Sequence, residues 1–281
     1  MHKVVERTRI VPNIHLLRLE APAVVRRVVP GSFVIVKIDE VAERIPLSVA
    51  DWDEETGIIS IVFMTVGAST HRLAKLEAGD EIEACVGPLG KPQQIEKFGT
   101  VAVAMGCYGI GAVLPVARAM KEAGNRVIAI MEARAQELVY WDDKYREFAD
   151  RFFLTTFGDS GPGGGRVSDV IDRLIGEGEQ IDRVVAMGCM FMMKKTAEIT
   201  RPHKLKTIVS LNPVMIDGTG MCGVCRCSVG GQTRFACVDG PDFDGRAVDF
   251  AELMSRQRVY VDDEREADAE YERECACRTK G

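Results

Sequence analysis

The hydrophobic pattern of the chain changes near residue 98, and this change limits the folds that the chain can adopt. From residue 1 to about 97, β-rich runs such as "VVPGSFVIVKI" and "GIISIVFMTVG" alternate with Gly and Pro turns, which is typical of an antiparallel barrel. From Val101 onward, short β-branched runs alternate with amphipathic stretches, beginning with "VAVAM", "GCYGIG" and "AVLPVARAMKEAG". This second pattern indicates a parallel sheet covered by helices.

Two further changes in composition follow the predicted parallel sheet. Residues 211–260 are rich in cysteine and glycine, and residues 261–281 are densely charged with few apolar side chains. We therefore expect a β-barrel at 1–97, an α/β domain at 98–210, a cysteine-rich segment at 211–260 and a tail at 261–281. The tail should be a solvated helix or a mobile end. With 281 residues, 46% of them hydrophobic, the chain is long enough for two domain cores.

Charge and hydropathy exclude several classes of partner. The formal net charge is −6, and the lysines and arginines are scattered among acidic residues, so we expect no nucleic-acid partner. No apolar run approaches the roughly 18 residues of a membrane-spanning helix, and the N-terminus lacks the apolar core of a signal peptide. We expect a soluble, cytoplasmic protein without membrane insertion.

Nine cysteines are many for a cytoplasmic protein, and four of them crowd together. These four are Cys222, Cys225, Cys227 and Cys237. In a reducing compartment, clustered thiols are more often ligands of a metal ion or an iron–sulfur cluster than disulfide partners. The segment therefore predicts an iron–sulfur or zinc site.

A glycine turn joins the first predicted strand of the α/β domain to a helix. Gly106, Gly109 and Gly111 directly follow "VAVAM", and glycines at this place let the backbone approach a pyrophosphate at a helix N-terminus. The spacing is not a strict G-x-G-x-x-G, so a simple tight turn explains these glycines equally well. After the next strand, Glu132 and Arg134 stand where a ribose-binding group would lie.

Two other stretches lie at the ends of predicted strands. "RIPLS" supplies Arg44, which could hold a diphosphate, and Ser48, which could hydrogen-bond a flavin ring. Taken alone, "RIPLS" is better interpreted as a strand end with a surface arginine. "MGCMFMMK" stands where a loop would meet a nicotinamide, although core packing is the favoured role of its methionines, which are Met187, Met190, Met192 and Met193.

Several of these motifs together resemble a known family. "RIPLS", the glycine turn with Pro115 behind it, "LNPVMIDGTGMCGVCRCSVGG" and "FACVDGPDFDG" are similar to the small, FAD-containing subunit of NADH-dependent reduced ferredoxin:NADP oxidoreductase. They are more distantly similar to the electron-transfer subunit of dihydroorotate dehydrogenase and to the related sulfide dehydrogenase subunit. The resemblance extends to about Arg258. It implies a ferredoxin reductase-like fold, with an antiparallel β-barrel FAD domain, an α/β parallel-sheet NAD domain and a C-terminal 2Fe–2S segment.

The resemblance also implies positions for both nucleotides. It assigns FAD to the "RIPLS" strand and to the "VGAST" turn near the FAD phosphates, namely to Arg44, Pro46, Leu47, Ser48, Gly67, Ser69 and Thr70. Ser48 is the candidate for tuning the flavin, and no other catalytic residue is implied. NAD(H) is assigned to Gly106 and Gly109, with Glu132 to Arg134 beside the adenosine ribose.

This chain departs from the family pattern in two places. Cys107 and Ala112 stand where the family commonly has glycine and proline, and Gly188-Cys189 stands where it usually has Gly-Pro. Both changes affect the predicted nucleotide site, so NADP(H) remains possible beside NAD(H).

The fourth cluster ligand requires a separate argument. Plant-type 2Fe–2S ferredoxins use C-x4-C-x2-C and a distant fourth cysteine. Here Cys222 and Cys225 form the C-x2-C pair, and Cys237 is the distant cysteine. Counting back from Cys222 reaches Asp217, where the resemblance implies a carboxylate ligand. Cys227 competes for this role, although it leads away from the loop.

Two alternatives to this ligand set stay open. Asp217 precedes a glycine and could be only a turn residue. A zinc ion could instead use Cys222 and Cys225 with two of the other nearby or C-terminal thiols, which are Cys227, Cys237, Cys275 and Cys277. If the tail is solvated, Cys275 and Cys277 are bystanders.

These parts predict an electron-transfer protein. NADH carries a hydride, an iron–sulfur cluster carries single electrons, and a flavin converts between the two. We therefore expect a subunit that passes electrons between NAD(P)H and a larger flavin or iron–sulfur partner, in some cases within an electron-bifurcating complex and with ferredoxin as an indirect partner. The alternative is a non-catalytic regulatory or scaffold protein that binds a nucleotide and zinc.

Overall fold

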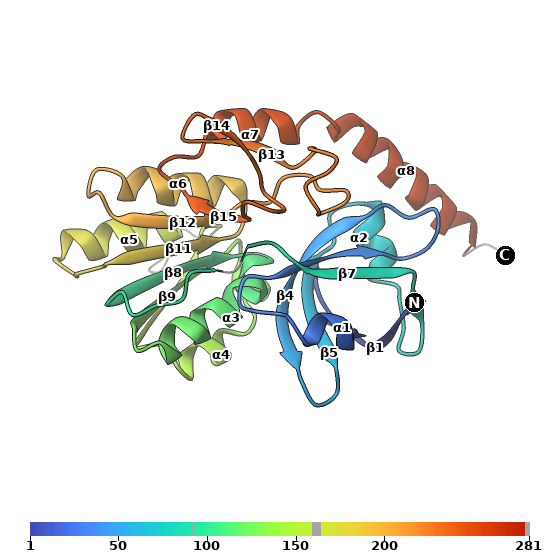
Figure 1. The fold of residues 1–281 in the computed structure, drawn as a ribbon, viewed down its shortest axis with the longest axis horizontal. Helices are drawn as coiled ribbons and strands as arrows, with labels where there is room; N and C mark the ends of the chain where they lie inside the picture. Colours follow the sequence, from blue (N-terminus) through green and yellow to red (C-terminus); the bar gives the residue numbers. More distant parts are fainter. Residues whose placement is uncertain (92, 159–163, 279–281) are drawn as a thin grey trace.

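The computed structural model describes residues 1–91, 93–158 and 164–278. A barrel and an α/β layer lie side by side, and the C-terminal segment extends over both (Figure 1). No helix within the described ranges is long and apolar enough to cross a membrane.

The barrel is a seven-stranded antiparallel sheet in the order β6-β1-β2-β5-β4-β3-β7. Its strands are β1 (His2–Val11), β2 (Ile14–Glu20), β3 (Phe33–Lys37), β4 (Ile45–Asp53), β5 (Ile58–Met64), β6 (Glu81–Ile82) and β7 (Ala84–Leu89). Alternate side chains of β2 and β5 fill its interior, including Leu17, Leu19, Ile59 and Ile61, because successive strand residues point to opposite faces. Two short helices complete the barrel, α1 (Pro22–Val25) and α2 (Ala68–Leu73).

The α/β part is built on a six-stranded sheet in the order β10-β9-β8-β11-β12-β15. Five of its strands are parallel, namely β8 (Thr100–Gly106), β9 (Arg126–Ala133), β10 (Arg151–Thr156), β11 (Arg183–Met187) and β12 (Lys206–Ser210). The chain order reverses between β8 and β11, and ligands of such sheets bind outside the carboxyl ends of the strands at this switch point. A ligand is therefore expected at the loops that follow Gly106 and Met187.

Helices cover both faces of the parallel sheet (Figure 1). They are α3 (Gly109–Glu122), α4 (Asp142–Arg146), α5 (Val167–Gly176) and α6 (Met190–Thr200), with a short 3-10 turn η1 at Gln136–Leu138. α3 contacts β8, β9 and β11 and also the barrel strands β4 and β5, whereas α5 and α6 pack on the other face. α3 consequently joins the barrel to the α/β part, and its first turn lies next to the switch point.

The C-terminal segment is not structurally separate from the α/β part. It contains the hairpin β13 (Arg226–Val229) and β14 (Gln232–Phe235), followed by β15 (Asp242–Asp244) and α7 (Phe250–Gln257). β15 pairs antiparallel with β12 and so becomes an edge strand of the six-stranded sheet. Its Phe243 and the α7 residues Phe250 and Leu253 belong to the same apolar core as α5 and α6. The boundary expected after residue 210 is therefore crossed by main-chain pairing.

The charged tail is the helix α8 (Val261–Arg278), and one face of it contacts α2. The rings of His71 and Tyr271 stack with centroids 5.8 Å apart, and Lys75 Nζ lies 2.8 Å from Cys275 Sγ. The expected helix is present, but it is docked on the barrel along part of its length instead of being surrounded by solvent. The side chain of Cys277 is outside the described residues.

Candidate functional site

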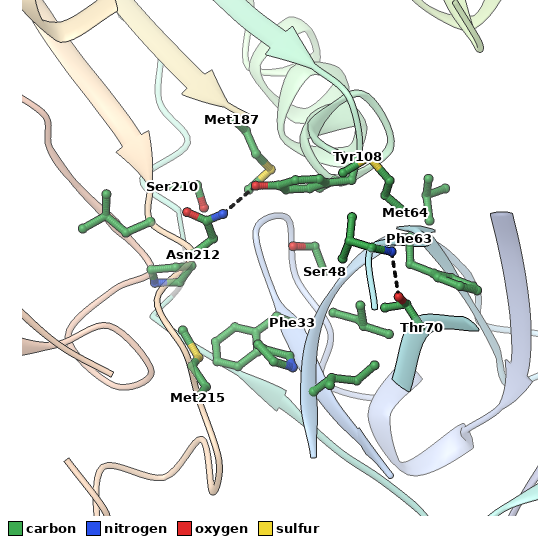
Figure 2. A pocket seen from close by; sticks show the side chains of 18 residues that line it. Phe33, Ser48, Phe63, Met64, Thr70, Tyr108, Met187, Ser210, Asn212 and Met215 are labelled. Carbon is green, nitrogen blue, oxygen red and sulfur yellow. Dashed lines mark hydrogen bonds between the residues drawn. The ribbon is translucent and has the colours of Figure 1, made fainter. Parts of the chain in front are cut away.

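A cavity of about 350 Å³ lies between the barrel, the α/β part and the start of the C-terminal segment (Figure 2). Apolar side chains form most of its wall, and a few hydroxyl and amide groups interrupt them. The lining includes Phe33, Pro46, Leu47, Ser48, Thr70, Tyr108, Met187, Ser210, Asn212 and Met215. An apolar pocket of this size with a few polar groups is typical of a binding site for a small organic molecule or cofactor.

Strand β4 brings three of the predicted flavin residues into this wall. Pro46, Leu47 and Ser48 pair with β3 in register, with Ser48 opposite Phe33, and all three line the cavity. Thr70 of α2 also lines it. Its hydroxyl accepts a hydrogen bond from the Val66 N–H at 2.9 Å and fixes the turn before α2.

The other three predicted flavin residues lie outside the cavity lining. Arg44 is exposed directly before β4. Gly67 is the N-cap of α2, and Ser69 donates a hydrogen bond to Glu43 at 2.7 Å. Each of these residues adjoins in sequence a residue of the lining, namely Ile45, Val66 or Thr70.

The glycine turn has a packing role that its sequence pattern does not reveal. Gly106 ends β8 and Gly109 begins α3. A Cβ atom at Gly109 would overlap the Met187 carbonyl group at the end of β11, and one at Gly106 would lie 2.9 Å from the Glu132 side chain. Gly109 therefore lets α3 approach β11 closely, and Gly106 leaves room for the Glu132 side chain, in addition to any role in binding a phosphate.

Glu132 and Arg134 have different environments. Glu132 is 2% exposed, and its carboxylate accepts a hydrogen bond from the Val167 N–H at 2.9 Å and lies 3.4 Å from Arg166. Burial raises its pKa above the ordinary value. Arg134 is exposed. The sequence left open which of the two faces a ribose. In the structure the Glu132 carboxylate binds the N-terminus of α5, and the assignment of either residue to the ribose stays a prediction.

Three side chains of the cavity wall were not predicted as a group. Tyr108, from the loop between β8 and α3, donates a hydrogen bond to the Gly188 carbonyl at 2.9 Å. It accepts one from the Asn212 side chain at 2.6 Å. Met187 stands beside them (Figure 2). The one sequence feature that could have indicated this group is the aromatic Tyr108 inside the glycine turn, where small residues are expected.

The four predicted cluster ligands fall into two pairs. Cys222 Sγ lies 3.3 Å from Asp217 Oδ1, and Cys225 Sγ lies 3.2 Å from Cys237 Sγ. Asp217 also accepts hydrogen bonds from the backbone N–H groups of Thr219 at 3.1 Å and Cys222 at 3.0 Å. These bonds, that of Thr219 foremost, hold the pKa of Asp217 below the ordinary value. At neutral pH its carboxylate is therefore ionised and available as a metal ligand.

The competing thiols are placed elsewhere. Cys227 is buried on β13, and its nearest hydrogen-bonding neighbour is the Arg234 carbonyl at 3.7 Å. Cys275 lies on α8 against Lys75. Within the described ranges, no three His, Cys, Asp or Glu side chains converge as the ligands of a single metal ion. The donors are thus arranged as separate pairs and do not form one tetrahedral set.

Comparison with known proteins agrees with this geometry. Residues 212–249 match the iron–sulfur cluster binding domain of dihydroorotate dehydrogenase B. The chain is 39% identical to the dihydroorotate dehydrogenase B (NAD(+)) electron transfer subunit homolog of Thermotoga maritima, covering 94% of this chain and 93% of the relative. It is 41% identical to an uncharacterized protein in the adh 3′ region of Clostridium beijerinckii, with 97% and 95% covered.

Solved structures support the same conclusion. A chain of the NADH-dependent reduced ferredoxin–NADP oxidoreductase, from a study of flavin-based electron bifurcation, superposes with a TM-score of 0.89 at 38% identity and covers 97% of each chain. A ferredoxin NADP+ reductase of Neisseria gonorrhoeae shares the fold, with a TM-score of 0.58 at 16% identity, covering 72% of this chain and 89% of that one. The predicted ferredoxin reductase-like fold and family resemblance are confirmed. The chain belongs to the family of electron-transfer subunits that includes that of dihydroorotate dehydrogenase B.

Proposed function

We propose that this subunit passes electrons between NAD(H) and a larger flavin or iron–sulfur subunit, by way of an FAD in the cavity and a 2Fe–2S cluster in the C-terminal loop. The observation that carries the proposal is the adjacency of the two sites. Met215 lines the cavity, and the candidate ligand Asp217 follows two residues later. Two residues of chain span at most about 7 Å, so a flavin ring and a cluster held there would be close neighbours.

The cavity fits the ring system of a flavin. Its wall offers apolar surfaces for a flat aromatic ring, and Ser48 and Ser210 supply hydroxyl groups for the polar edge. Arg44, Gly67 and Ser69, on the segments flanking the cavity, would then hold the diphosphate, as the resemblance implies. FAD, when bound, supplies exchange of a hydride on one side and of single electrons on the other.

The cluster loop fits a two-iron centre better than a single ion. Two donor pairs correspond to two ligands for each iron, since a 2Fe–2S cluster takes four protein ligands. Gly218 packs so tightly against Ile35 and Leu89 of the barrel that a Cβ would come within 2.9 Å of Ile35. The barrel therefore holds the loop, with Asp217 ionised, at the edge of the cavity.

The nucleotide site is proposed at the switch point of the sheet. Gly106 and Gly109 flank the loop that would face a diphosphate, and the exposed Arg134 lies after the neighbouring strand β9. We assign NAD(H) to this site on family resemblance. The exposed guanidinium of Arg134 is also compatible with a 2′-phosphate, so NADP(H) is the second candidate.

The partner subunit is proposed to dock around the cluster loop. Ile216, Met221 and Val238 adjoin the four candidate ligands in sequence and are 48%, 88% and 45% exposed. Exposed apolar side chains gathered in one place mark interaction sites. A partner seated there would cover the cluster and receive single electrons, and ferredoxin would then be reached through that partner.

The alternative is a regulatory or scaffold protein that binds a nucleotide and zinc. The visible spectrum and metal content of protein purified without oxygen distinguish the two. The proposal predicts one FAD and two irons per chain, with a flavin band and broad cluster absorption. A colourless protein with one zinc per chain would show that the proposed function is wrong.

A further inference from the structure

Tyr108 connects three parts of the molecule at the wall of the cavity. Its hydroxyl donates to the Gly188 carbonyl, in the loop after β11, at 2.9 Å and accepts from Asn212, at the start of the C-terminal segment, at 2.6 Å. Figure 2 shows its ring beside Met187 on the α3 side of the cavity, across from the barrel wall that contains Ser48. The phenol thus lies between the nucleotide loop and the space proposed for the flavin.

Both ends of this connection are themselves fixed. Tyr108 follows Cys107, whose φ of 52° is rare for a residue other than glycine, and the Cys107 carbonyl accepts a hydrogen bond from Tyr140 at 2.8 Å. On the other side, Gln257 of α7 donates to the Asn212 carbonyl at 2.9 Å. The ring is therefore held in a defined position by its surroundings and is not a surface side chain that points into the cavity by chance.

The position of the Tyr108 ring bears on hydride transfer, because it lines the cavity next to the proposed nucleotide loop. Donor and acceptor atoms must approach to about 3–3.5 Å for reaction, so a nicotinamide must reach the flavin face directly. A cavity of about 350 Å³ is at the small end of ligand pockets, and Tyr108 and Met187 line it where β8 and β11 end at the switch point. A nicotinamide that enters from the switch-point loops would meet Tyr108 before it reached the space proposed for the flavin.

We infer that Tyr108 is a closing residue for the nicotinamide position, held shut by Asn212 and Gly188 and displaced when the nicotinamide enters. The inference rests on the proposed function, because it requires a nicotinamide nucleotide at the switch point. It adds a specific consequence: part of the binding free energy of the nucleotide is spent on breaking the two hydrogen bonds of the Tyr108 hydroxyl. Removing these bonds should tighten binding of any ligand that carries the nicotinamide ring.

The test compares Tyr108→Phe with Tyr140→Phe in the FAD- and cluster-loaded protein. Tyr140 also makes two hydrogen bonds to this loop region, to the Cys107 carbonyl at 2.8 Å and from the Gly111 N–H at 3.2 Å, but it does not line the cavity. Dissociation constants are measured by calorimetry for NAD+ and for ADP-ribose, which has the same diphosphate but no nicotinamide. Tyr108→Phe should bind NAD+ about three- to tenfold more tightly, the size of about one neutral hydrogen bond, and bind ADP-ribose as the wild type does.

Asn212→Ala should reproduce part of this gain, and the double variant should bind no more tightly than Tyr108→Phe, because both changes release the same residue. Tyr140→Phe should not tighten NAD+ binding. An unchanged or weaker affinity of Tyr108→Phe for NAD+ would overturn the inference about Tyr108 and leave the proposed function unaffected. If the wild type bound neither NAD+ nor NADP+, the proposed function would fail, and the inference with it.

Discussion

The Sγ atoms of Cys225 and Cys237 lie 3.2 Å apart although eleven residues separate them in the chain. The hairpin explains this distance, because Cys225 directly precedes β13 and Cys237 follows β14, with Arg226 paired to Phe235. The two thiols therefore lie at the open end of the hairpin. The long spacing in the sequence becomes a short distance through ordinary antiparallel pairing.

The ligand set makes the first prediction. Asp217→Ala should lose or destabilise the cluster, since one iron would then have a position open to water. Asp217→Cys should retain a 2Fe–2S centre with an altered paramagnetic resonance signal, because it restores C-x4-C-x2-C. Iron content and the resonance spectrum after anaerobic reduction provide the measurement.

Cys227→Ser is the matched control for the ligand set. The Cys227 thiol is buried on β13 next to the Arg234 carbonyl, so its replacement should leave iron content nearly unchanged. Loss of the cluster in Cys227→Ser, together with a normal cluster in Asp217→Ala, would mean that the fourth ligand is Cys227.

The sequence predicted the cluster loop well because ligand spacing is a local property. Asp217 was found from the C-x4-C spacing, since four residues separate it from Cys222, and this count requires no knowledge of the fold. The hydrogen bond between Tyr108 and Asn212 joins residues 104 positions apart, and no local sequence pattern predicts it. The inward direction of Glu132 depends likewise on where α5 begins, since its carboxylate meets the Val167 N–H. Such contacts arise only when distant segments pack.

The glycine turn makes a second prediction, about stability. Gly109→Ala should lower the free energy of unfolding by about 1–3 kcal/mol, because the added methyl group would overlap the Met187 carbonyl group and push α3 from β11. Gly176→Ala is the control, since nothing lies within 4 Å of its Cβ position at the end of α5. It should be stabilising by about 0.5–1 kcal/mol. The free energies of unfolding of both variants are measured with urea. Equal values for Gly109→Ala and Gly176→Ala would contradict the packing role of Gly109.

The tail makes a third prediction. Removal of residues 262–281 should leave iron and sulfide content unchanged, because Cys275 lies against Lys75 on the barrel side of α8. The variant should lose the stacking of Tyr271 on His71, and its melting temperature reports that loss. A truncated protein without iron would show that a thiol of the tail is a cluster ligand.

A fourth prediction concerns Asp242 of β15, whose Oδ2 atom is buried with no hydrogen-bond partner among the described residues. Burial raises the pKa of this carboxyl to about 7, and the Ser210 hydroxyl offsets the rise only in part. The folded protein therefore binds a proton that the unfolded chain has released. The stability of the wild type should fall between pH about 4 and pH about 7, by up to about 4 kcal/mol, and then level off.

Asp242→Asn removes this titration, so its urea midpoint should vary less over the same pH range and exceed that of the wild type at pH about 8. If the urea midpoints of the two proteins changed with pH in the same way, Asp242 would be ionised in the native state over this pH range.

The central claim is that the cavity and the cluster loop form one electron path, and an anaerobic titration with NADH tests it most directly. Flavin absorbance and the paramagnetic resonance of the cluster are followed in the same samples. The account predicts that NADH bleaches the flavin band and produces the signal of a reduced 2Fe–2S cluster in the isolated subunit, because Met215 of the cavity and Asp217 of the loop are two residues apart. A bleached flavin beside a cluster that stays oxidised, yet is reduced by dithionite, would contradict it.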